Sequence, residues 1–191
     1  MSVSTFSYTD VPDALLDLLV GHVPHSLPLL RCLQFTKLHG SGTPAPKILF
    51  ASDNSIPPWE GAGGQVDAFT AAYLDLAAGP ETQMWVYSTL EDNGLSEEEE
   101  DICSRQIESL VNEARRIGRE YDGELAYPGR ILIGSLHSST QGIIERKGIK
   151  LDRRSTLGYD KWLFKARAVS GERICTSSSS QAFPKRERDV R

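Results

Sequence analysis

Residues 69–90 carry the pattern that most restricts how this chain folds. Two runs rich in aromatic and β-branched side chains, 69–76 and 83–90, lie on either side of a turn at Gly79-Pro80. Runs of this kind around a Gly-Pro turn predict an antiparallel β-hairpin. The fold must therefore contain a β-sheet built on this hairpin.

A long amphipathic helix is predicted directly after the hairpin. Ser96, with Glu99 three residues later, matches a capping box, and apolar residues recur at helical spacing as far as position 117. The helix is expected to end near Gly118. Its first turn holds an unbroken acidic run, residues 97–101, which suits the positive end of a helix dipole.

The remaining segments complete an alternating order of helices and strands. Helices are predicted from Asp10 and from Ser26, strands at 47–52, 130–137 and 159–165, a short helix at 140–147 and a loop at 56–65. This order predicts an α/β fold, α+β in stricter terms, with one mixed sheet of about six or seven strands and helices on both faces. We expect one domain, residues 1–168, and a flexible Ser-rich, charged tail, residues 169–191.

Composition excludes several classes of partner and site. The net charge of −5 and the pI near 5.4 argue against nucleic acid as the main partner, and no apolar run is long enough for a membrane span. With no targeting signal visible, we expect a cytoplasmic protein that acts on a small molecule. The three cysteines form no C-x-x-C pair, and His22, His25 and His39, expected at the surface or in capping roles, have no metal-site spacing. The oligomeric state stays open.

The predicted order and several short motifs resemble the GNAT (N-acetyltransferase) superfamily. Ile131-Leu-Ile-Gly-Ser-Leu-His, followed by Ile144-Glu-Arg-Lys-Gly-Ile, is similar to the penultimate strand and following helix end of that family. The stretches 27–31, 79–91 and 159–164 look like uncharacterised fungal members related to glycine N-acyltransferases. The resemblance implies an acyltransferase in secondary metabolism, with acyl-CoA as donor and a slot between two splayed strands for its pantetheine arm.

The resemblance also implies the residues that would bind the donor. The backbone of Val86, Ser88, Thr89 and Leu90 would bind the pantetheine amide and polarise the thioester carbonyl. The chain departs from the family pattern at two places. No glycine-rich pyrophosphate turn precedes Ser96, and Ile144 replaces a tyrosine that would protonate the departing thiolate.

Three functional interpretations therefore remain open. The first is transfer of an acyl group from an acyl thioester to an amine or hydroxyl of a small molecule, with CoA bound in an altered way. In the second, the scaffold has lost CoA and acts as a cofactor-free cyclase or isomerase on a small apolar biosynthetic intermediate. The third is a catalytically silent binding domain, because fold does not determine function.

Two side chains are candidates for proton transfer. His137 ends the strand beside the expected slot, and an imidazole titrates close to neutral pH, although the same position suits a histidine that bonds the next helix. Asp75, among leucines, would hold a water that deprotonates the acceptor, or would simply be solvated near the turn. Ser135 shares a strand face with His137 and would contact the same substrate.

Aromatic side chains of the hairpin are candidates for the acceptor pocket. Strand alternation places Tyr73 on one face of the first strand, and Trp85 and Tyr87 together on one face of the second. A half-exposed sheet with cross-strand aromatic pairs would show the same pattern. Trp59, in the Pro- and Gly-rich loop, is either part of a lid over the cleft or part of a linker.

Overall fold

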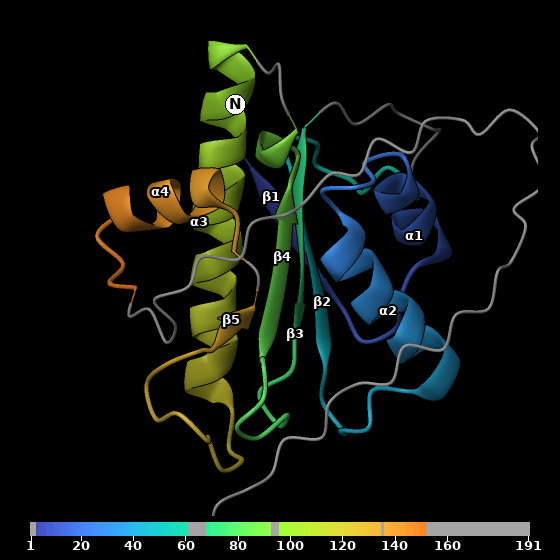
Figure 1. The fold of residues 1–191 in the computed structure, drawn as a ribbon, viewed down its shortest axis with the longest axis vertical. Helices are drawn as coiled ribbons and strands as arrows, with labels where there is room; N and C mark the ends of the chain where they lie inside the picture. The colour runs from blue at the N-terminus through green and yellow to red at the C-terminus, as the bar shows by residue number, and fades with distance from the viewer. Residues whose placement is uncertain (1–2, 61–67, 93–95, 135, 152–191) are drawn as a thin grey trace, which may run out of the picture. The chain divides into compact units, whose positions relative to one another are not determined.

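The computed structural model describes residues 3–60, 68–92, 96–134 and 136–151. The ten elements found there, shown in Figure 1, are β1 (Ser4–Tyr8), α1 (Asp13–Val20), α2 (Leu27–His39), β2 (Lys47–Ser52), β3 (Phe69–Leu74), β4 (Met84–Ser88), the 3₁₀ turn η1 (Thr89–Glu91), α3 (Glu97–Glu120), β5 (Ile133–Gly134) and α4 (Ser138–Arg146). None of the helices within these ranges is both long and apolar enough to cross a bilayer.

The strands form one mixed sheet in the order β1-β2-β3-β4-β5. The first four strands are antiparallel to their neighbours, whereas β5 runs parallel to β4. The predicted hairpin is β3 and β4, in which Tyr73 lies opposite Trp85 and Ala71 lies opposite Tyr87. A single mixed sheet flanked by helices confirms the predicted fold class.

Helices cover both faces of the sheet, with α1 and α2 on one side and α3 on the other (Figure 1). Alternation along the strands explains the two layers, because neighbouring side chains point to opposite faces. The core under α1 and α2 includes Leu15, Leu33, Ile48, Phe50, Phe69 and Tyr87. The core under α3 includes Leu49, Ala51, Leu74, Val86 and Leu110.

β1 is an element that the sequence analysis did not predict. All five of its residues pair with β2, from Ser4 opposite Ser52 to Tyr8 opposite Ile48. The strand lies at the edge of the sheet, so none of its side chains is fully buried and its apolar signal is weak. Only Phe6 and Tyr8, two residues apart, pack against the core.

β5 is much shorter than the strand predicted over 130–137. It pairs with β4 at only two positions, Met84 with Ile133 and Trp85 with Gly134. Among the described residues, Val86–Ser88 of β4 therefore has no partner strand on this side. The last strand predicted at 159–165, the domain boundary at 168 and the tail lie outside the described residues.

Candidate functional site

A pocket of about 620 Å³ lies between the segments that follow β4 and β5. Leu90 and Asp92 contribute from the β4 side, and the first turns of α4 contribute from the β5 side. The start of α3 forms the third wall. The lining residues are Leu90, Asp92, Glu97, Glu100, Asp101, Ser104, Ser138, Ser139, Gly142, Ile143 and Arg146. The pocket therefore lies beyond the C-terminal ends of β4 and β5.

The charge of this pocket does not fit the pyrophosphate of CoA. Four of its lining residues are carboxylates, and Arg146 is the one basic lining residue in the described part of the chain. At the start of α3 the Ser96 amide donates to Glu99 Oε2 at 2.7 Å, and the Glu99 amide donates to Ser96 Oγ at 3.3 Å. The first of these bonds is the main reason that the pKa of Glu99 lies below its ordinary value. Helix amides that would otherwise attract a phosphate are thus already capped.

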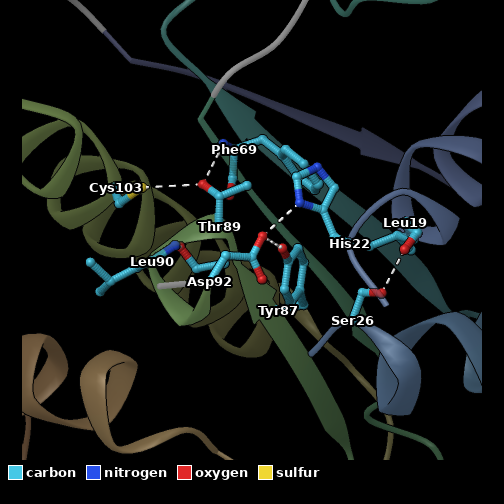
Figure 2. Close-up of polar contacts among 10 residues, drawn as sticks. Leu19, His22, Ser26, Phe69, Tyr87, Thr89, Leu90, Asp92 and Cys103 are labelled. Carbon is cyan, nitrogen blue, oxygen red and sulfur yellow. Dashed lines mark hydrogen bonds and ion pairs between the residues drawn. The ribbon is translucent and has the colours of Figure 1, made fainter. Parts of the chain in front are cut away.

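A histidine, an aspartate and a tyrosine meet beside this pocket (Figure 2). His22 Nδ1 lies 2.6 Å from Asp92 Oδ2, and the Tyr87 hydroxyl donates to the same oxygen at 2.7 Å. The residues come from the α1–α2 connection, the end of β4 and the segment after η1. We call these three residues the His22 cluster.

Packing around the His22 cluster holds its geometry. The imidazole makes an edge contact with Phe69, with ring centroids 5.1 Å apart, and lies 5.8 Å from the Tyr87 ring. Ser26 Oγ donates to the Leu19 carbonyl at 2.6 Å and ties the two ends of the α1–α2 connection together (Figure 2). Burial, and then the hydrogen bond to Asp92, raise the pKa of Tyr87, so its hydroxyl stays protonated and donates.

A second pocket, of about 580 Å³, lies between α2 and the β3–β4 hairpin. It is lined by Pro28, Arg31, Cys32, Phe35, Thr36, Ser41, Tyr73 and Trp85. Beside Tyr73, the Asp75 carboxylate accepts hydrogen bonds from the Tyr73 hydroxyl at 3.3 Å and from Thr43 Oγ1 at 2.7 Å. Burial, then the Asp75 charge, raise the pKa of Tyr73 to about 12, so its phenol is neutral at physiological pH.

The aromatic candidates lie in three different places. Tyr73 and Trp85 lie together in the second pocket, whereas Tyr87 is fully buried and belongs to the His22 cluster. Trp59 packs against Phe50, with ring centroids 4.7 Å apart, and against Tyr8. It therefore covers the β1–β2 side of the core.

His137 and Asp75, the candidates for proton transfer, both accept hydrogen bonds from groups within the protein. His137 Nδ1 accepts the Ser139 amide at 3.3 Å and caps α4, and its ring lies 6.4 Å from that of His25. Asp75 is 3% exposed, and it also accepts the Ala77 amide at 3.0 Å. Ser135 lies outside the described residues. Among the residues described, no three His, Cys, Asp or Glu side chains are grouped as a metal site requires.

The side chains at the end of β4 are also committed to internal contacts. Ser88 Oγ accepts Thr70 Oγ1 at 3.0 Å, and Thr89 Oγ1 accepts the Phe69 amide at 3.1 Å. Val86 packs in the core under α3, while Leu90 reaches the acidic pocket. The backbone of this segment and the side chain of Leu90 are therefore the candidates for contact with a ligand.

Sequence reasoning missed the His22 cluster. The sequence offers no reason to select Asp92, and it predicts a surface or capping role for His22. The two residues are 70 positions apart and share no motif, so no local spacing indicates that they meet. The available signal is the broken helical pattern at Gly21-His22, which marks a connection that can turn back over the sheet.

An antiparallel sheet that ends in a parallel β4–β5 pair, paired at only two positions, is consistent with the fold of acyl-CoA N-acyltransferases. Residues 2–162 match the family described as acyl-CoA N-acyltransferase verG N-terminal domain. The chain belongs to this family, which confirms the GNAT-like resemblance. No curated protein and no solved structure matches the chain.

Proposed function

We propose that the protein transfers an acyl group from an acyl thioester to an amine or hydroxyl of a small molecule. The observation that carries this proposal is the side of β4 at Val86–Ser88 that pairs with no strand of the described residues, in a chain whose family is an acyl-CoA N-acyltransferase domain. Backbone amides and carbonyls along such an edge suit an extended arm that contains amide groups. The acyl thioester would lie there, with its carbonyl polarised by the backbone between Val86 and Leu90.

The second pocket would take the acceptor. Its apolar wall of Trp85, Phe35 and Pro28 suits a molecule with an apolar body, and Tyr73 offers a hydroxyl that orients a polar group. Trp85 lines this pocket, and it is also the last residue of β4 that pairs with β5. The acceptor and the thioester would therefore approach each other along β4.

One observation favours a second candidate function. The carboxylates at the start of α3 disfavour the phosphates of CoA, which is the expected result if the scaffold has given up the thioester donor. The protein would then be a cofactor-free cyclase or isomerase in which the apolar second pocket shapes one product.

Release of thiol separates these two functions. Purified protein is incubated with acetyl and longer acyl thioesters and a panel of small amines and alcohols, and free thiol and product mass are followed together. We expect thiol release that depends on the acceptor and is strongly reduced in Trp85→Ala. Leu38→Ala, an exposed residue of α2 that lines neither pocket, serves as the matched control. A folded protein that releases no thiol with any thioester would refute acyl transfer.

A further inference from the structure

The His22 cluster has the geometry of an oriented base. Asp92 Oδ2 receives two short hydrogen bonds, from His22 Nδ1 and from the Tyr87 hydroxyl. A carboxylate oxygen can only accept, so the imidazole proton must lie on Nδ1. In the neutral ring the lone pair of Nε2 is then free to take a proton, and no described residue donates to it.

The cluster lies at the edge of the first pocket, and its histidine lies on the connection that leads into α2, a wall of the second pocket. Asp92 lines the pocket between the β4 and β5 segments, and His22 belongs to the connection between α1 and α2. The side chain of His22 is 24% exposed, so solvent or a ligand can reach the ring. Asp92 Oδ1 is also buried without a hydrogen-bond partner among the described residues. A fully satisfied structural ion pair leaves no such atom.

We propose that His22 is the base that removes a proton from the acceptor, that Asp92 orients it, and that Tyr87 positions Asp92. This proposal rests on the proposed acyl transfer. The acceptor N–H or O–H gives its proton to His22 Nε2 as the acceptor atom bonds to the thioester carbonyl carbon. The C–S bond then breaks, and the thiolate leaves with the proton that His22 returns, so thioester and amine become amide and thiol.

His137 does not have the same preparation for this role. Its Nδ1 already accepts the Ser139 amide at the start of α4, so a proton on this ring belongs on Nε2. In that tautomer neither ring nitrogen of His137 offers a free lone pair. A ring nitrogen with a free lone pair is therefore expected in His22 and not in His137.

Three substitutions test the cluster. In His22→Asn the amide nitrogen replaces Nδ1 as donor to Asp92 while the base is lost. Asp92→Asn turns the acceptor toward His22 into a donor and reverses the tautomer. We expect both to lower kcat/KM by about 10²–10⁴-fold, the usual contribution of a positioned acid or base. Tyr87→Phe should lower kcat with little change in KM, and His39→Asn, an exposed histidine of α2, should be unchanged.

The pH profile distinguishes a base from a merely structural histidine. The titratable groups that face His22 are Asp92 and Tyr87, and Glu91 lies close enough to raise the pKa of Tyr87. We expect kcat/KM of the wild type to fall at low pH as an imidazole becomes protonated. His22→Asn should lose that limb, and added imidazole should partly restore turnover in His22→Ala.

Failure of this inference is distinguishable from failure of the proposed function. A wild-type protein that transfers no acyl group overturns both. A wild type that transfers acyl groups, with His22→Asn and Asp92→Asn retaining its kcat/KM and pH profile, overturns the role of His22 alone. Thermal unfolding of each variant accompanies the assay. If His22→Asn does not fold, the tautomer reversal in Asp92→Asn and the kcat loss in Tyr87→Phe decide the question.

Discussion

The Cys32 thiol lies where it is a poor nucleophile at neutral pH. Burial, and then the nearby Asp75 charge, raise its pKa to about 11. Because the thiolate is the reactive form, we expect iodoacetamide to modify Cys32 slowly at pH 7.5 and much faster as the pH approaches 11. Peptide mapping by mass spectrometry measures this rate directly.

Asp75→Asn provides the matched control for that measurement. It removes the negative charge but keeps a side chain of the same shape, so labelling of Cys32 at a fixed pH should accelerate. A labelling rate at pH 7.5 equal to that of an unperturbed small thiol would contradict the buried position of Cys32 in the second pocket.

Individual residues differ in how far their surroundings can be predicted from sequence. Tyr73 and Trp85 are brought together by hairpin register, a local property that the two strand patterns and the turn between them determine. His22 and Asp92 meet because the α1–α2 connection folds back over β4. That contact depends on the packing of whole helices, so neither residue carries a sequence signal for it.

At the scale of elements, the two-residue β5 depends on the absence of a side chain at Gly134. A Cβ there would lie 2.6 Å from Thr82 Cγ2 and 3.0 Å from two carbons of the Trp85 ring. Gly134→Ala should therefore push the indole aside or lift β5 from β4. We expect a loss of about 1–3 kcal/mol in the free energy of unfolding, as in overpacked cores. Urea unfolding followed by tryptophan fluorescence measures it.

Gly118 in α3 is the matched control, because nothing lies within 4 Å of a Cβ added there. In a helix interior, alanine is more stable than glycine by roughly 0.5–1 kcal/mol. Gly118→Ala should therefore stabilise the protein while Gly134→Ala destabilises it. If Gly134→Ala stabilised the protein as Gly118→Ala does, the close approach of β5 to Trp85 would be wrong.

Elements with strong local signals were predictable, and elements defined by their neighbours were not. α3 has both a capping box and a sustained helical period, and its observed start agrees with the predicted one. β1 lacks a strong apolar pattern and is a strand because β2 offers it an open edge. β5 pairs with β4 at only two positions, and the apolar run from Arg130 does not encode how much of it pairs.

At the scale of the whole molecule, a buried phenol and a partly buried thiol make the stability of the fold depend on pH in the alkaline range. The pKa of Cys32 rises from 9.0 to about 11 and that of Tyr73 from 10.0 to about 12. A group whose pKa is higher in the folded state binds its proton more tightly there, so its contribution is complete below the unfolded pKa. We expect Tm to be steady up to about pH 9 and to fall between about pH 9 and 12. A Tm that stays flat to pH 12 would contradict the burial of both groups.

The distribution of charge over the molecule predicts which kind of acyl donor the protein prefers. Residues 91–101 hold seven carboxylates and no Lys or Arg, so this segment carries −7 in a chain of net charge −5. Three residues of its helical part, Glu97, Glu100 and Asp101, line the pocket beyond the β4–β5 gap, and Asp101 is paired with Arg105. A donor with phosphates would therefore meet repulsion at the end of its arm, whereas an uncharged thioester would not.

Comparison of acyl-CoA with the acyl-N-acetylcysteamine thioester of the same acyl group tests this charge effect. We expect the two kcat/KM values to lie within about tenfold of each other, which is about 1.4 kcal/mol. Raising the ionic strength should improve the use of acyl-CoA alone, because salt screens exposed charges over about 10 Å at 0.1 M. The double variant Glu97→Lys/Glu100→Lys should favour acyl-CoA in the same way. A strong preference of the wild type for acyl-CoA, weakened by salt, would mean that the phosphates bind a basic surface elsewhere and that the acidic pocket serves another ligand.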